Sequence, residues 1–397
     1  MKKTIPLGSR KAGALVLILA LGLVAVCPAA EDTWTYKAEM PTARGFTSGC
    51  VVDGKIYVIG GFPTHYSVTT AVEMYDPIAD TWTRMSNMPS GRCAHATCTY
   101  GGKIYVFGGV SPDPYSTAKK NVYEYDPQTN TWTQKADIPY ANAYCGIAVV
   151  NDTIYLIGGM SRYNAPPVST VMAYHPLTDS WSEKAPMHTA RGMLSACTLD
   201  GKIYAIGGNK NVYTSSYKVV EVYDPATNTW TTKTDMPTAR AALGVCVVSG
   251  NIYAIGGYNY PVMCTSNEMY DPVSDTWISK SPMQETRLMF FLGSVGDKIY
   301  AIGGSYPNPQ NSTLPVILSS TEEYDTGLGF LIADFNSDGI VDLDDLVIFI
   351  EFWDTDEPLC DIAPHPYGDG IVDRLDLELF ISYWEQENMP ENTEDIE

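Results

Sequence analysis

The sequence predicts an all-β protein built from six similar units, and two recurring features support this class. Gly-Gly pairs return at a period near fifty residues, beginning at Gly60, Gly108, Gly158, Gly207, Gly256 and Gly303. A tyrosine stands three residues before each pair, a Tyr-Asp-Pro motif or close variant follows each pair, and a Trp comes next in five of the six copies. A repeat of this period indicates units that cannot bury their own faces and therefore stack on their neighbours.

In each unit, the segment before the Gly-Gly pair is expected to be a strand covered on both faces. In the first unit, residues 56–59 read Ile-Tyr-Val-Ile, which is short, apolar and β-branched or aromatic, without strict alternation. The Gly-Gly pair allows a sharp exit and a close approach by the neighbouring sheet. The Trp offers a large area for burial at the rim. Each unit is expected to run in chain order from an inner to an outer strand.

Gly-Gly, Tyr and Trp in this fixed order resemble the kelch repeat of β-propellers, over about residues 32–325. The last unit stops at Tyr324-Asp325 without its Trp, whereas the chain supplies an orphan Asp32-Thr33-Trp34-Thr35 near its start. We therefore expect the N-terminal segment to form the outer strand of the last blade, which leaves no open sheet edge. The resemblance implies a monomeric six-bladed kelch-type propeller over residues 31–327.

Residues 1–30 are typical of a signal peptide. Basic residues at Lys2, Lys3 and Arg10 precede an uncharged apolar run at 12–26, which is too short for a comfortable membrane span. Cleavage is expected near Ala29 or Ala30, so the protein is predicted to be secreted or held at the cell surface. Cys27 raises the alternative of a lipid anchor, but Val26 before it is larger than the residue such sites usually carry. No other stretch is predicted to cross a bilayer.

The acidity of the chain is concentrated near its C-terminus. The formal net charge is −21, and residues 331–397 hold 20 Asp or Glu against one Arg. The propeller is therefore nearly neutral, and this distribution argues against nucleic acid as a partner. Four cysteines stand ten residues before a Gly-Gly pair, at Cys50, Cys98, Cys197 and Cys246. They are interpreted as small buried apolar residues rather than a metal ring, because no histidine occupies matching positions.

Residues 334–345 carry the pattern of a calcium loop. The expected oxygen ligands of this loop are Asp334, Asn336, Asp338, the carbonyl of Ile340 and Asp345. A second copy includes Asp369 and Asp376, but strict alignment puts His365 at position 1 and Tyr367 at position 3. One alternative is that Asp361 substitutes as a ligand through a looped-out segment at 363–366, and the other is a helix hairpin without metal.

Two such copies, with Asp in the twelfth position of the first, resemble a dockerin type I module over residues 328–385. The resemblance implies helices of the EF-hand kind, bound calcium and docking to a cohesin domain. The partner-selecting positions, Leu343-Asp344 and Arg374-Leu375, are not the Ser-Thr pair of cellulosomal forms. Two interpretations therefore remain: the module docks to an unidentified cohesin, or it is a self-contained stabilising module without a partner. Residues 386–397 are expected to be an acidic disordered tail.

Charged residues also recur at fixed positions in the propeller. An arginine lies sixteen residues before the Gly-Gly pair at Arg44, Arg92, Arg191, Arg240 and Arg287. A glutamate lies two residues before the motif tyrosine at Glu73, Glu221, Glu268 and Glu322. The third unit lacks both, with Asn142 and Met172 in their places, which suggests that the two support each other. One interpretation is a structural ion pair. The other places Arg44, Arg191, Arg240 and Arg287 at a channel mouth, where they capture a ligand carboxylate.

The segment after each Gly-Gly pair is variable and carries tyrosine in every copy. The tyrosines assigned to a predicted ligand-binding face are Tyr66, Tyr115, Tyr163, Tyr213, Tyr258 and Tyr306. Prolines stiffen these segments, and aromatic loops on a rigid scaffold make a binding face for a glycan or a protein.

Two classes of function compete. The first is a secreted, non-catalytic binding or adaptor protein, including an accessory to polysaccharide degradation. The second is a carbohydrate-active enzyme such as an N-acetylneuraminate mutarotase or epimerase, since kelch-like propellers include six-bladed sialic-acid mutarotases. A copper oxidase is disfavoured because His65, His95, His175 and His188 are scattered and unpaired. Binding is the preferred interpretation, because no nucleophile motif or phosphate loop is present.

Overall fold

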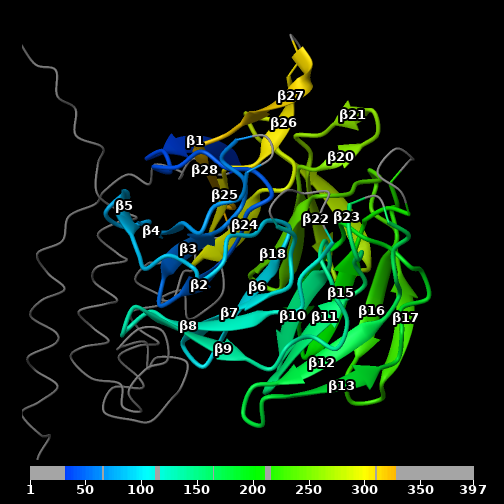
Figure 1. The fold of residues 1–397 in the computed structure, drawn as a ribbon. Helices are drawn as coiled ribbons and strands as arrows, with labels where there is room; N and C mark the ends of the chain where they lie inside the picture. Colours follow the sequence, from blue (N-terminus) through cyan, green and yellow to red (C-terminus); the bar gives the residue numbers. More distant parts are fainter. Residues whose placement is uncertain are drawn as a thin grey trace, which may run out of the picture. The chain divides into compact units, whose positions relative to one another are not determined.

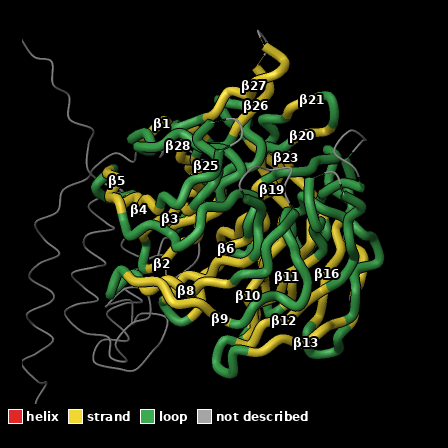
Figure 2. The backbone as a smooth tube through the Cα atoms, viewed as in Figure 1, coloured by secondary structure: helices red, strands yellow, loops and turns green. Residues whose placement is uncertain are grey.

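The computed structural model describes residues 32–327, except 65–66, 112–116, 164, 211–215 and 309–310. The predicted signal peptide, calcium module and acidic tail lie outside the described residues. The described part is all-β and forms six four-stranded antiparallel sheets, the blades of a propeller (Figure 1). The tube view shows strands joined by turns and loops throughout this part (Figure 2). The prediction of six blades is confirmed.

Five blades follow the chain from inner to outer strand. Blade 1 has β2 (Ser48–Val52), β3 (Lys55–Ile59), β4 (Val72–Asp76) and β5 (Thr81–Arg84). Blade 2 has β6 (Ala96–Tyr100), β7 (Lys103–Phe107), β8 (Val122–Asp126) and β9 (Thr131–Lys135). Blade 3 has β10 (Gly146–Val150), β11 (Thr153–Ile157), β12 (Val171–His175) and β13 (Ser180–Lys184). Blade 4 has β14 (Ser195–Leu199), β15 (Lys202–Ile206), β16 (Val220–Asp224) and β17 (Thr229–Lys233). Blade 5 has β18 (Gly244–Val248), β19 (Asn251–Ile255), β22 (Asn267–Asp271) and β23 (Thr276–Lys280).

The sixth blade combines the two ends of the propeller sequence. It has β24 (Phe291–Val295), β25 (Lys298–Ile302), β28 (Thr321–Asp325) and the N-terminal β1 (Thr33–Lys37). β1 pairs antiparallel with β28, so that Trp34 stands opposite Tyr324 with their ring centroids 5.0 Å apart. The predicted closure by the N-terminal strand is therefore confirmed, and it covers the outer edge that β28 would otherwise expose.

Two extra hairpins leave the blades at the ends of their second strands. One joins β20 (Tyr258–Asn259) to β21 (Val262–Met263) in blade 5. The other joins β26 (Ser305–Asn308) to β27 (Asn311–Ile317) in blade 6. Both project on the same side of the wheel (Figure 1).

The second strand of each blade is buried on both faces because it is sandwiched between two neighbouring blades. In β3, Tyr57 and Ile59 share a buried cluster with residues of blade 2, including Ile104. Ile56 and Val58 point the other way and pack with Phe291 and Ile302 of blade 6. This explains why the strand shows no alternation of apolar and polar residues.

The Gly-Gly pairs are required where neighbouring blades approach most closely. Gly60 and Gly61 have φ angles of 59° and 95°, which are strained for residues with a side chain. A Cβ on Gly60 would lie 2.6 Å from the carbonyl oxygen of Arg92, which precedes the inner strand of blade 2. A Cβ on Gly61 would lie 2.7 Å from the carbonyl oxygen of Gly45. The predicted close backbone approach is therefore present.

A two-point clamp joins each blade to the next. In blade 1, the Asp80 carboxylate accepts hydrogen bonds from Tyr75 Oη at 2.6 Å and from the backbone N–H of Ala38 at 2.8 Å. Trp82 Nε1 donates to the carbonyl of the same Ala38 at 2.9 Å. Equivalent residues accepting the tyrosine and backbone bonds are Asn130, Asp179, Asn228, Asp275 and Asp32.

The N-terminal segment supplies the last of these clamps. The Asp32 carboxylate accepts from the N–H of Ser281, and Trp34 Nε1 donates to the Ser281 carbonyl, each at 2.8 Å. Ring closure thus uses the same contacts that join the other blades. The orphan Asp-Thr-Trp in the sequence is explained by this clamp.

The four repeated cysteines lie on inner strands and are buried, as predicted. Cys50, Cys98, Cys197 and Cys246 are each at most 9% exposed and form no disulfide. Burial raises the pKa of the Cys50 thiol to about 12, with a weaker opposing effect from Thr99. These thiols therefore behave as small apolar side chains.

Candidate ligand-binding face and axial channel

The five repeated arginines are fully buried inside their own blades. In blade 5, the Arg240 guanidinium contacts Glu268 at 2.7 Å and donates to the carbonyls of Ala254, Gly256 and Ser266. Arg44, Arg191 and Arg287 form the same kind of pair with Glu73, Glu221 and Glu322, at 3.0, 3.1 and 2.9 Å. Each arginine therefore ties the loop before the inner strand to the second and third strands of its blade.

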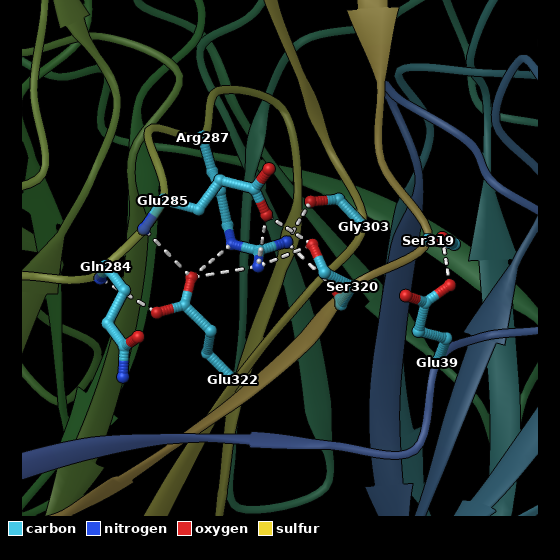
Figure 3. Close-up of polar contacts among 8 residues, drawn as sticks. All are labelled: Glu39, Gln284, Glu285, Arg287, Gly303, Ser319, Ser320 and Glu322. Atoms are coloured by element: carbon cyan, nitrogen blue, oxygen red, sulfur yellow. Dashed lines mark hydrogen bonds and ion pairs between the residues drawn. The ribbon is translucent and has the colours of Figure 1, made fainter.

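Blade 6 shows the most complete version of this arrangement (Figure 3). Arg287 Nε and Nη2 donate to Glu322 at 3.1 and 2.9 Å, while Nη1 donates to the carbonyls of Gly303 and Ser320. A second carboxylate, Glu285, lies 3.1 Å from Nη2 and accepts from Ser320 Oγ. The guanidinium is thus enclosed by two carboxylates and two carbonyls, so no donor is left for a ligand.

Blades 2 and 3 lack the Arg–Glu pair and have other contacts in its place. In blade 2, Tyr123 replaces the glutamate, and the Arg92 guanidinium lies over its ring, 4.8 Å from the centroid. In blade 3, Asn142 replaces the arginine and donates to the Gly158 carbonyl at 2.9 Å, with the apolar Met172 in place of the glutamate. Arg and Glu are therefore lost together in the third blade because they form an ion pair in blades 1, 4, 5 and 6.

The prediction that placed Arg44, Arg191, Arg240 and Arg287 on a ligand-binding face is wrong. Burial lowers the pKa of Arg44 and of Arg191 to about 10, and the partner glutamates oppose this effect, so both stay charged at neutral pH. Their charges are neutralised within the blade and their exposure is zero. The structural interpretation of the Arg and Glu repeats is the correct one.

The predicted tyrosines do not share one environment. Tyr258 is only 7% exposed, accepts from Asn209 Nδ2 at 2.8 Å and contacts Met193 Sδ, so it belongs to the interior. Tyr163 and Tyr306 are half-buried, and Tyr163 packs against Tyr144 with centroids 6.0 Å apart. The remaining three predicted tyrosines, Tyr66, Tyr115 and Tyr213, lie outside the described residues.

The most exposed apolar groups on this side are in the β20–β21 hairpin. Tyr260 is 49% exposed and Val262 is 61% exposed. Tyr163 follows β11 of blade 3 and Tyr306 lies in β26, so both belong to segments that leave the end of a second strand. Together with the β20–β21 and β26–β27 hairpins (Figure 1), they define what we call the loop face. Val262 was missed by sequence reasoning, because a single valine in a loop gives no signal of exposure.

Beneath the loop face, six residues with left-handed backbone surround the axis, one before each inner strand. They are Phe46, Ala94, Tyr144, Met193, Ala242 and Met289, with φ between 51° and 58°. Backbone hydrogen bonds of 2.8–3.2 Å run from one to the next, from Phe46 round to Met289. Phe46 and Tyr144 also make an edge-to-face contact with centroids 6.3 Å apart. The result is an apolar ring, which we call the axial ring.

Two adjoining cavities lie along the inner strands, and the residues of the axial ring line the upper one. The upper cavity has a volume of about 150 Å³ and includes His95, Cys145 and Ser195 in its lining. The lower cavity has a volume of about 390 Å³ and shares Thr47, Ser195 and other residues with the upper one. No Arg, Lys, Asp or Glu is among the described residues that line them. The axis is therefore an uncharged channel of hydroxyl, carbonyl and apolar groups.

The described residues show neither a metal-binding cluster nor a membrane-spanning helix. This part of the chain contains no group of three His, Cys, Asp or Glu side chains arranged to hold a metal ion. Within the same residues there is no helix with the length and hydropathy that a membrane span needs. The predicted calcium ligands, Asp334, Asn336, Asp338, Ile340, Asp345, Asp369 and Asp376, lie outside them.

Comparison with known proteins agrees with this geometry. A family model for the kelch-repeat domain of KLHDC2, KLHL20 and DRC7 matches residues 30–208. A model for the kelch motif matches residues 190–237 and 239–284. A solved structure described as "Structure of YjhT" is similar, with a TM-score of 0.62 and 16% identity, covering 72% of this chain and 95% of that one. A comparison with curated proteins gave no match.

These findings establish the class of the protein. The chain contains kelch repeats and folds as a six-bladed β-propeller. This class is consistent with a binding or adaptor role. The likeness to YjhT at 16% identity shows a shared fold and nothing about activity.

Proposed function

We propose that this protein is a secreted, non-catalytic binding protein whose propeller holds a glycan or a protein on its loop face. The observation that carries the proposal is the placement of the repeated arginines. The guanidiniums that would capture a sugar carboxylate are buried in ion pairs within the blades. Exposed apolar side chains are present on the projecting β20–β21 hairpin, where a large ligand can reach Tyr260 and Val262.

The uncharged channel supports binding over acid–base catalysis. A mutarotase needs an acid–base pair beside its sugar, and a carboxylated sugar also needs a cation. The titratable side chains that line the axial cavities in the described structure are His95, Tyr144 and the cysteines. Burial raises the pKa of Cys145 to about 12 and lowers that of His95 to about 3, so neither is suited to exchange protons at neutral pH.

The rest of the proposed function concerns segments outside the described residues. Residues 1–30 would direct export and be removed. Residues 328–385 would fold around calcium and dock to a cohesin or another extracellular protein, which would tether the propeller near its ligand. The support is the sequence pattern: oxygen ligands at the spacing of a calcium loop, and an apolar run after a basic start.

A sugar mutarotase or epimerase is the second candidate. It is favoured by the number of blades, because the sialic-acid mutarotases among kelch-like propellers also have six. The loop face rather than the buried arginines would then have to supply the chemistry.

One experiment separates the two candidates. The secreted protein is screened on a glycan array and, in parallel, assayed for interconversion of N-acetylneuraminate anomers by NMR. The proposal predicts retention of a glycan or a protein ligand with anomer exchange at the uncatalysed rate. Acceleration of anomer exchange by catalytic amounts of protein would refute the non-catalytic proposal and favour the mutarotase.

A further inference from the structure

His95 is a buried polar group whose presence the blade architecture does not explain. It follows Ala94 of the axial ring, and its side chain is 6% exposed and lines the upper axial cavity. The equivalent positions in the other blades carry Thr47, Cys145, Leu194, Leu243 and Phe290. Since apolar residues fill this position in three blades, the fold itself does not require an imidazole there.

Neither ring nitrogen of His95 has a hydrogen-bond partner of normal geometry. The Ile59 carbonyl is near enough to influence the imidazole, but it already accepts from Thr47 Oγ1 at 3.0 Å. A buried polar group without a partner is unfavourable, so native proteins normally satisfy it with protein, water or ligand. The imidazole therefore marks a position where something else makes its hydrogen bonds.

The electrostatics of the cavity restrict what that partner is. Burial, followed by the positive charges of Arg92 and Arg44, lowers the pKa of His95 to about 3. The imidazole is thus neutral at physiological pH, and one nitrogen donates while the other accepts. A bound cation is disfavoured as well, because no Asp or Glu is among the described residues that line the cavity. A carboxylate offers acceptors alone, so it cannot serve the accepting nitrogen.

The size and lining of the cavity also favour a small hydroxylated ligand. A volume of about 150 Å³ is that of a cavity which holds a molecule of roughly six heavy atoms, such as benzene. Here the lining is mixed, because it includes the hydroxyl residues Thr47, Ser48 and Ser195 beside the apolar Phe46 and Met289. Such a lining suits a molecule with hydroxyls on a short carbon chain.

We propose that the upper axial cavity binds a small uncharged hydroxylated molecule of the size of glycerol or erythritol, with His95 as its main hydrogen-bonding partner. A hydroxyl both donates and accepts, which matches a neutral imidazole. The lower cavity adjoins this site, because it shares Thr47, Ser48 and Ser195 with the upper one. This site is separate from the loop face and does not depend on the function proposed for it.

The test follows the His95 imidazole directly. The full-length protein is labelled with ¹⁵N in histidine, and its ring nitrogens are observed by NMR while erythritol or glycerol is added. The His188→Ala variant removes a mostly exposed histidine and assists assignment. The proposal predicts saturable shifts of the His95 nitrogens with at least one of the two polyols, in the wild type and in His188→Ala alike.

The His95→Leu variant supplies the second readout, because Leu194 and Leu243 show that the position accepts leucine. Without polyol it is expected to melt at a Tm no lower than the wild type. Polyols stabilise proteins non-specifically, so the informative quantity is the difference between the two proteins. Affinity for the polyol should fall about tenfold or more in His95→Leu, as expected when a buried hydrogen-bonding partner is lost. Unchanged His95 resonances with both polyols, or equal affinity in the variant, would overturn the proposal and leave the cavity to water.

Discussion

At the scale of single residues, the repeated Arg and Glu act inside the blade. The sequence predicted their association, because both are missing from the third unit. It could not show the backbone carbonyls that complete the site, since any residue supplies a carbonyl. In blade 5, Arg240 ends up with Glu268 and three carbonyls around it and no exposed atoms. The recurrence of an arginine at a fixed position therefore does not distinguish a ligand-binding arginine from a structural one.

Replacing Arg240 alone should destabilise the propeller strongly. Arg240→Asn leaves Glu268 buried without its counter-charge, and removing one partner of a buried ion pair costs about 3–5 kcal/mol. Urea unfolding of the purified full-length protein, followed by tryptophan fluorescence, measures this change.

Blade 3 provides a matched control for that prediction. The double variant Arg240→Asn/Glu268→Met copies the residues that blade 3 has at these positions, Asn142 and Met172. It should recover part of the lost stability, because no buried charge remains unpaired. A double variant that is less stable than Arg240→Asn would show that the glutamate is not the source of the cost.

Tyr260 gives a residue-scale prediction about ligand binding. Tyr260→Ala should weaken binding of the ligand found on the array about tenfold, because a single aromatic contact at a binding centre is worth more than about 1 kcal/mol. Stability should change little, since the side chain is 49% exposed. Tyr36→Ala is the control, because Tyr36 is similarly exposed at 55% but lies on the outer strand β1. Equal effects of both substitutions would argue against the loop face.

At the scale of the structural element, the clamp explains two sequence features at once. The Asp or Asn after the Tyr-Asp-Pro motif and the Trp two residues later hold the backbone of one residue in the preceding blade. The sequence showed both residues and predicted that the Trp is buried at the rim. It did not show the preceding blade as the partner, because that contact joins residues more than forty positions apart.

The clamp predicts a pH dependence that is confined to the blades with Asp. The Tyr270 hydroxyl, through its hydrogen bond, is the main cause that lowers the pKa of Asp275 below its usual 3.8. A lowered folded-state pKa gives stability that is complete above the unfolded pKa and is lost as the pH falls through the folded value. Asp275→Asn keeps the acceptor without the charge, so its difference in stability from the wild type should shrink below about pH 4.

Blade 4 offers the reciprocal variant. There Asn228 accepts from Tyr223 at 2.7 Å, so Asn228→Asp should introduce the same acid sensitivity. Urea unfolding at neutral pH and near pH 3 measures both differences. Differences that are equal at the two pH values would contradict a carboxylate that titrates on unfolding.

At the scale of the whole molecule, the period of the repeat predicted the number of blades, and the two ends of the propeller sequence predicted its closure. The decisive sequence feature was the missing Trp in the last unit together with the orphan Trp34. The loop face was predicted less well. Tyr258, for example, is buried by Asn209 and Met193, which belong to the preceding blade. Packing between variable loops depends on three-dimensional contacts that no period encodes.

Closure by β1 is central to the propeller, and hydrogen exchange on the purified full-length protein tests it most directly. Peptides that contain Thr33–Lys37 and Thr321–Asp325 are compared by mass spectrometry after exchange into deuterated buffer. The account predicts that the hydrogen-bonded amides of β1 are protected as long as those of β28, because both exchange only when the last blade opens. Exchange of β1 at the rate of an unstructured peptide, with β28 still protected, would contradict closure by the N-terminal strand.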